Sequence, residues 1–169
     1  VFDYNLTVYI PETTEDIKTF RLTDTLDPAL ELVNPNAFTI MYLKRGAEDD
    51  DTSIKDWGQN IIAQPAEKNA SHSIQYYLTT QNHDTSVLKG RTIVMSFKAK
   101  VKDSWTYDDL VAGGYVKEGS KNPQIPNTAQ LAFNDWNSDS NTVIVEPNNG
   151  PDVEKSVGEV GQTGLTLTN

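Results

Sequence analysis

Strict alternation of apolar and polar residues is the feature that most constrains the fold of this chain. In residues 2–10 the apolar side chains Phe2, Tyr4, Leu6 and Val8 share one parity, and mostly polar residues lie between them. Successive side chains of a β-strand point to opposite faces, so this segment predicts a strand with one buried face. The pattern recurs along the chain in short segments that are separated by turn-forming residues.

The other alternating segments predict a protein built mainly of strands. Helix signals are few, and the clearest is 104–112, which has a capping candidate, early acidic residues and a glycine stop at Gly113. We therefore expect an all-β sandwich with one or two short helices. The further predicted strands are 19–26, 38–43, 73–78, 91–101, 125–133 and 141–145.

A linker rich in Pro, Gly and Asn at 146–152 predicts a domain boundary. We expect a β-sandwich domain over 1–147, followed by a linker and one more strand over 148–169. About 20 residues cannot bury a core of their own. The tail must therefore pair with the sandwich, pair with another molecule or stay disordered. Because Val1 already lies in a strand pattern and no signal peptide is visible, we expect the chain to be a piece of something longer.

Charge and composition exclude several classes of protein. The chain has 14 basic and 24 acidic residues, a formal net charge of −10, which argues against nucleic-acid partners and against docking on anionic membranes. It has no cysteine, so disulfides, zinc–thiolate sites and cysteine nucleophiles are excluded. No run of about 18 apolar residues that could span a membrane is present.

Three polar residues occupy the apolar parity of predicted strands: Asp24, Asn127 and Lys155. Burying such groups singly is costly, but the cost falls if the three meet. A neutral lysine amine can attack an asparagine carboxamide, leaving an isopeptide bond and releasing ammonia. Burial lowers the pKa of the lysine and raises that of the acid, which can then hydrogen-bond the carboxamide oxygen and shuttle a proton to the leaving nitrogen.

Each of the three residues also has an ordinary explanation. Asp24 precedes a turn-like stretch at 25–28 and fits a turn or cap residue. Asn127 follows Pro126 and could hydrogen-bond a sheet edge. Lys155 could extend its ammonium to solvent from a boundary strand.

Five short motifs resemble the isopeptide-forming domains of Gram-positive pilins and surface adhesins. The similarity is closest to the C-terminal stalk domains of antigen I/II-type streptococcal adhesins. The motifs are FDYNLTVYIP at 2–11, FRLTDTLD at 20–27, IPNTAQL at 125–131, SNTVIVEP at 140–147 and PDVEKSV at 151–157.

The resemblance implies an immunoglobulin-like sandwich of the collagen-adhesin type with a Lys155–Asn127 bond and Asp24 as the adjacent acid. Asn141, taken as a second inward-facing asparagine, is an alternative to Asn127. In the family the lysine strand comes first, whereas here it comes last. Two explanations are open: the chain runs from one repeat into the next, or the domain is permuted. In either case a sandwich without its first strand has an open edge, which the tail of the same or another molecule could fill.

Other candidate sites carry weaker signals. The acidic run Glu48, Asp49, Asp50 and Asp51 could bind calcium through oxygen ligands, although it lacks EF-hand spacing and also fits a solvated loop. We expect no other cofactor. The two histidines, His72 and His83, fit surface positions better than catalysis. The remaining candidates are the insert 47–69, for partner contacts, and the three tryptophans, as a sugar groove or as core residues or edge covers: Trp57, Trp105 and Trp136.

The expected function is structural rather than enzymatic, because the crosslink forms once without turnover. We expect a stalk module of a cell-wall-anchored bacterial adhesin or pilus on the extracellular surface. Its expected partners are neighbouring domains of the same protein, another copy by strand exchange, and a host protein or glycan. The alternative is a ligand-binding adhesin module for carbohydrate or host protein, with or without calcium. A hydrolase has no support beyond scattered acids.

Overall fold

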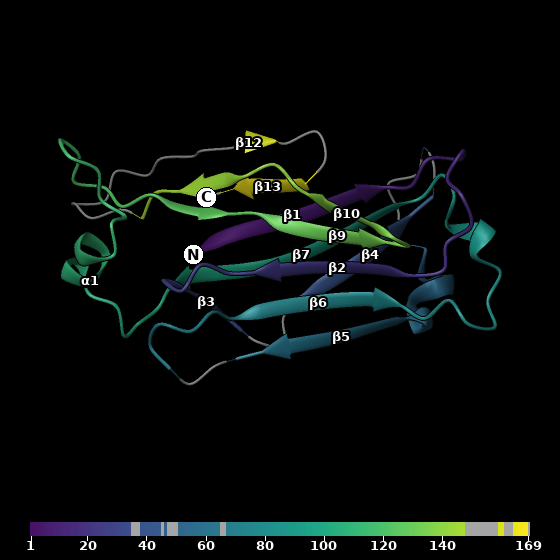
Figure 1. Cartoon of the computed structure of the whole chain (residues 1–169), viewed down its shortest axis with the longest axis horizontal. Helices are drawn as coiled ribbons and strands as arrows, with labels where there is room; N and C mark the ends of the chain where they lie inside the picture. Colours follow the sequence, from purple (N-terminus) through teal and green to yellow (C-terminus); the bar gives the residue numbers. More distant parts are fainter. Residues whose placement is uncertain are drawn as a thin grey trace.

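Antiparallel strands are the main regular elements of the computed structural model, and they form two main sheets (Figure 1). The structure describes residues 1–34, 38–44, 46, 51–64, 67–147, 159–160 and 164–168, with side chains left aside at 52, 159–160 and 164–168. The predicted all-β class is confirmed. No helix in these ranges has the length or the apolar character to cross a membrane.

The first sheet has the strand order β12-β13-β1-β7-β3, and β4 also pairs with β7. Every strand pair in it is antiparallel. Its strands are β1 (Phe2–Tyr9), β3 (Leu30–Leu32), β4 (Thr39–Leu43), β7 (Thr92–Val101), β12 (Glu159–Val160) and β13 (Gly164–Thr168).

The second sheet has the order β10-β9-β2-β6-β5, and a separate two-stranded sheet joins β11 to β8. These strands are β2 (Phe20–Thr25), β5 (Gly58–Ala63), β6 (Ser73–Leu78), β8 (Ile125–Asn127), β9 (Ala129–Phe133), β10 (Trp136–Asp139) and β11 (Val143–Val145). The helical segments are the α-helix α1 (Tyr107–Ala112) and the 3₁₀ turns η1 (Thr52–Trp57) and η2 (Thr85–Leu88).

The inward faces of the two main sheets share one hydrophobic core. The alternation in β1 buries every second side chain, and Tyr4 stacks on Phe97 of β7 with ring centroids 5.3 Å apart. Across the core, the hydroxyls of Tyr42 on β4 and Tyr76 on β6 lie 2.6 Å apart and are hydrogen-bonded. The two sheets are therefore joined by apolar packing and by a buried polar contact.

Sequence patterning located the long strands well and the short ones poorly. A strand lies within each segment that alternation predicted over residues 1–147, and 125–133 is divided at Thr128 into β8 and β9. The helix begins later than expected, because Thr106 forms a capping box with Asp109. The strands β3, β5 and β10 were not predicted. β5 and β10 have almost no buried residues, and β3 has only three residues.

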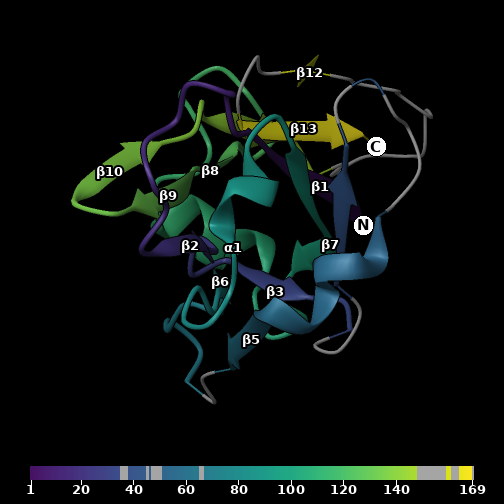
Figure 2. The ribbon, with the colours of Figure 1, turned by 90° about the vertical axis from the view of Figure 1, so that its right-hand side faces the viewer.

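The C-terminal strand β13 lies antiparallel beside β1 and extends the first sheet (Figure 2). Its register places Thr168 opposite Asp3 and Gly164 opposite Thr7. The predicted strand around Lys155 lies outside the described residues. The structure thus adds two short segments of the tail to the first sheet, β13 beside β1 and β12 beside β13.

Candidate crosslinking site

Asp24 and Asn127 meet in the core, 103 positions apart in sequence. β2 holds Asp24 opposite Ala129 of β9, and Asn127 ends β8 two residues earlier. The Nδ2 atom of Asn127 donates a 2.8 Å hydrogen bond to Oδ2 of Asp24. Their exposed fractions are 3% and 0%, so neither is a surface turn residue. Alternation had placed both side chains inside, and the structure brings them together.

Three oxygen atoms in this part of the core are buried with no hydrogen-bond partner among the described residues: Oδ1 of Asp24, Oδ1 of Asn127 and the hydroxyl of Tyr4, which interacts electrostatically with Asp24. A buried polar atom that lacks a partner costs about 1–3 kcal/mol. The core of a stable domain rarely tolerates several such atoms, and each calls for an explanation. Tyr4, a residue that the sequence pattern marked only as core, therefore joins the candidate site.

Electrostatics link these residues. Burial raises the pKa of Asp24 to about 7, and the hydrogen bond from Asn127 opposes that shift. Burial also raises the pKa of the Tyr4 phenol well above its usual range, and the negative charges of Asp24 and Asp27 add to it. Near neutral pH, Asp24 is therefore able both to accept and to donate a proton, which is the property a proton shuttle requires.

The contact differs from the expected one in its orientation. The sequence predicted that Asp24 would hydrogen-bond the carboxamide oxygen of Asn127, whereas it bonds the carboxamide nitrogen. The acid therefore lies at the atom that would leave as ammonia. The carbonyl oxygen of Asn127 accepts no hydrogen bond from the described residues.

The predicted lysine, Lys155, lies outside the described residues. Within them the buried lysine is Lys102, whose ammonium donates to the carbonyls of Lys68 and Ala70 at 2.8 and 2.6 Å. The ammonium of Lys102 therefore binds the backbone of the loop at 68–70. Asn141 precedes β11 and is exposed, so its predicted inward orientation is wrong.

The acidic run is described only at Asp51, because Glu48, Asp49 and Asp50 lie outside the described residues. Asp51 pairs with Arg91 at 2.6 Å and with Lys44 at 3.5 Å. The hydrogen bond from Arg91 holds the pKa of Asp51 well below its usual range. Its carboxylate also caps η1 through the backbone of Ser53. In the described part of the chain, no group of three or more acidic or histidine side chains is arranged to hold a metal.

The histidines and tryptophans form no common site. His83 stacks on Trp57 with ring centroids 4.1 Å apart, and His72 lies apart from this pair near Lys102. Trp105 donates its indole N–H to the carbonyl of Lys68. Trp136 is 71% exposed on β10.

Part of the expected 47–69 insert is regular structure. Residues 52–63 form η1 and then β5, the edge strand of the second sheet.

Comparison with known proteins leaves the chain without an assigned family. No protein-family model matches it, and no curated protein and no solved structure is significantly similar to it.

Proposed function

We propose that this chain is a stalk module of a cell-wall-anchored bacterial adhesin or pilus, with an immunoglobulin-like sandwich of the collagen-adhesin type. An amide bond between Lys155 and Asn127, formed with Asp24 as the proton shuttle, locks the module. The observation that carries the proposal is the buried Asp24–Asn127 pair together with the three oxygens that have no partner in the described part of the chain.

A primary amine is the group that best completes this cluster. An ammonium has three N–H donors and no acceptor, and the cluster offers three free oxygens as acceptors. The lysine side chain is the only protein side chain with that property. The sequence supplies one on an apolar strand parity at Lys155.

The reaction needs no external reagent. Asp24 first takes a proton from the ammonium of Lys155, which leaves a neutral amine. The amine nitrogen then forms a bond to Cγ of Asn127. Asp24 gives the proton it holds to Nδ2 and takes one from the attacking nitrogen, the carbonyl re-forms as the Cγ–Nδ2 bond breaks, and one ammonia leaves while Asp24 keeps one proton. Contact between the groups in the folded core supplies the effective molarity that free side chains lack.

An amide crosslink suits a load-bearing module. It is indifferent to reducing conditions, and the chain has no cysteine with which to make a disulfide. A covalent bond between the tail and β8 also prevents the tail from leaving the sandwich under tension. The net charge of −10 and the repeated strand pattern are consistent with an extracellular, protein-linked role.

Intact-mass measurement of the purified chain tests the proposal. The expected mass is that of the sequence minus one ammonia, and tryptic mapping should recover one branched peptide that contains Lys155 and Asn127. The matched control is Lys155→Arg, which keeps the positive charge but removes the nucleophilic amine. Asp24→Ala should also give the full mass, because the shuttle is lost. Wild-type protein with the full mass and a free Lys155 peptide would overturn the proposal.

A further inference from the structure

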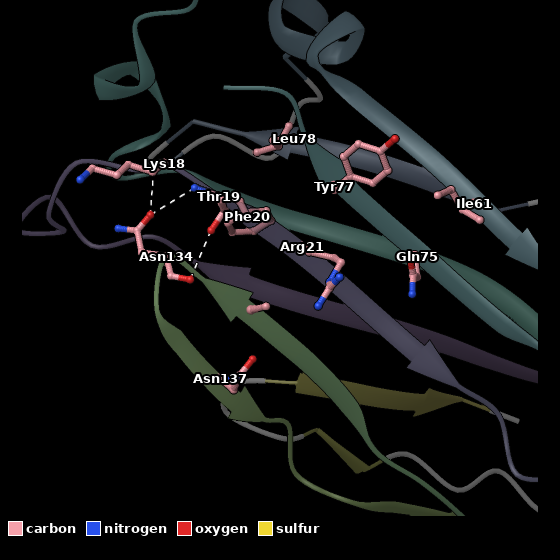
Figure 3. A pocket seen from close by; sticks show the side chains of 11 residues that line it. Lys18, Thr19, Phe20, Arg21, Ile61, Gln75, Tyr77, Leu78, Asn134 and Asn137 are labelled. Carbon is pink, nitrogen blue, oxygen red and sulfur yellow. Dashed lines mark hydrogen bonds between the residues drawn. The ribbon is translucent and has the colours of Figure 1, made fainter. Parts of the chain in front are cut away.

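A shallow groove of about 590 Å³ lies on the outer face of the second sheet (Figure 3). Its lining includes neither Asp24 nor Asn127. Strand register explains its shape. Arg21 of β2 lies opposite Tyr77 of β6 on one side and Ala132 of β9 on the other, and Ala132 lies opposite Asn137 of β10. Because the side chain of Ala132 is smaller than its neighbours, the surface of the sheet is hollowed at this position.

The lining of the groove is positively charged in an acidic protein. It includes Lys18 and Arg21 and no acidic residue, although acids outnumber bases by 24 to 14 in the whole chain. Among the described residues, neither Lys18 nor Arg21 has an ion-pair partner, whereas Arg91 pairs with Asp51. An exposed arginine without a partner is a ready site for an anionic group, because its planar guanidinium binds carboxylate or sulfate through two N–H donors.

Further polar groups in the groove are available to a ligand. The amide side chains of Gln75 and Asn137 make no hydrogen bond within the described part of the chain, and they flank Arg21 from two different strands (Figure 3). Tyr77 is held in place by donating its hydroxyl hydrogen to Gln59. The groove therefore combines a fixed aromatic ring, two free amides and two cations.

The end of the groove is also fixed in place. Oδ1 of Asn134, in the turn between β9 and β10, accepts the backbone N–H groups of Lys18 and Thr19 at 2.7 and 3.2 Å (Figure 3). This contact fixes the chain that carries Lys18 against the turn. The site is thus built on the paired strands of the second sheet and on one tied loop.

The backbone beneath the groove limits the class of ligand. The strands β9, β2 and β6 are each paired on both sides, so none offers main-chain groups to an added peptide strand. A ligand on the floor formed by these three strands is therefore recognised by side chains. From this charge and geometry, we infer that the groove binds a saccharide that carries a negatively charged group, with Arg21 holding the anion and Tyr77, Gln75 and Asn137 contacting the sugar.

Nuclear magnetic resonance titration of the full chain with small sugars tests the inference. The probes are 3′-sialyllactose, which carries a carboxylate, a sulfated lactose, neutral lactose and inorganic sulfate. The expected result is that at least one anionic sugar shifts amide signals of β2, β6 and β9, and that neither lactose nor sulfate does so at the same concentration. Arg21→Gln should weaken this binding roughly tenfold or more, since a charge-assisted hydrogen-bond pair is lost.

Two further variants distinguish binding in the groove from non-specific attraction of an anion to positive charge. Lys121→Gln removes one positive charge from an exposed loop outside the groove and should leave binding unchanged. Ala132→Leu fills the floor without altering charge and should abolish binding. No shift with either anionic sugar, an equal response to lactose or to sulfate, or full binding by Arg21→Gln would overturn the inference. None of these outcomes depends on whether the Lys155–Asn127 bond forms.

Discussion

At the scale of single residues, substituting Tyr4 distinguishes a structural role of its side chain from a role in the crosslink. Its hydroxyl is buried and has no partner within the described ranges, so in protein that cannot react we expect the group only to destabilise the core. In a Lys155→Ala background we therefore expect Tyr4→Phe to be neutral or to stabilise by about 1 kcal/mol. In the wild-type background the same change should slow ammonia loss, because one of the three oxygens around the amine is missing.

Mass spectra taken over time after refolding measure the rate of ammonia loss with and without Tyr4→Phe. Chemical denaturation of Lys155→Ala, with and without Tyr4→Phe, measures the change in stability. Loss of stability in both backgrounds together with an unchanged rate would make Tyr4 an ordinary core residue.

The raised pKa of Asp24 predicts how the stability of unreacted protein depends on pH. The folded protein holds this proton up to about pH 7, whereas the unfolded chain releases it near 3.8. Between these values the folded state binds more protons, so the free energy of unfolding falls as the pH rises and levels off above about 7. Thermal unfolding of Lys155→Ala at pH 5 and pH 8 should show this loss.

Asp24→Asn in the same background is the control for the pH prediction. His72 has a lowered pKa, and its contribution runs in the opposite direction over part of this range. The difference between the two variants therefore isolates Asp24. Identical pH profiles for both would contradict the assignment.

Sequence patterning found two members of the site and missed the third for a physical reason. Asp24 and Asn127 stand out because a charged group and an amide are rare on the buried parity of a strand. Tyr4 does not, because tyrosine is an ordinary core residue whose hydroxyl usually finds a partner. Only the three-dimensional arrangement reveals that no described residue hydrogen-bonds this hydroxyl.

At the scale of elements, the predictability of a strand follows its burial. β1 and β7 bury alternate residues over eight and ten positions, which gives a clear period of two. β5 is the edge strand of its sheet and has almost no buried residue, so its sequence carries no such signal. What places β5 is its pairing with β6, a long-range contact that no local pattern encodes.

The pairing of β13 with β1 can be tested with an engineered disulfide. Asn5 lies opposite Thr166, and directly opposed residues of antiparallel strands have Cβ atoms about 4.5–5.5 Å apart. Because the chain has no cysteine, the variant Asn5→Cys/Thr166→Cys should form one disulfide on mild oxidation. A non-reducing gel should show a monomer that migrates faster than its reduced form.

The control for this pairing is Asn5→Cys/Leu165→Cys, which is one residue out of register and should form the bond poorly. Equal yields from the two variants would contradict the register. A disulfide-linked dimer from the in-register pair would show that β13 is exchanged between copies.

At the scale of the whole molecule, we expect the crosslink to raise the free energy of unfolding. The bonded residues are 28 positions apart, and closing a loop of this length stabilises the folded state by on the order of 4 kcal/mol in the loop-entropy treatment used for disulfides. For a domain of this size that corresponds to a fall of roughly 10 °C in Tm when the bond cannot form.

Lys155→Arg should therefore unfold roughly 10 °C below wild type in a thermal scan, and added reductant should change neither midpoint, because an amide is not reduced. β13 lies along β1 of the same chain, so we expect the bond to form within one chain and boiled detergent gels to show a monomer. A covalent ladder would instead mean that the tail enters the next molecule, as head-to-tail insertion without closure requires. A wild-type Tm equal to that of Lys155→Arg, despite a confirmed bond, would contradict the stabilising role and leave the bond with a purely mechanical one.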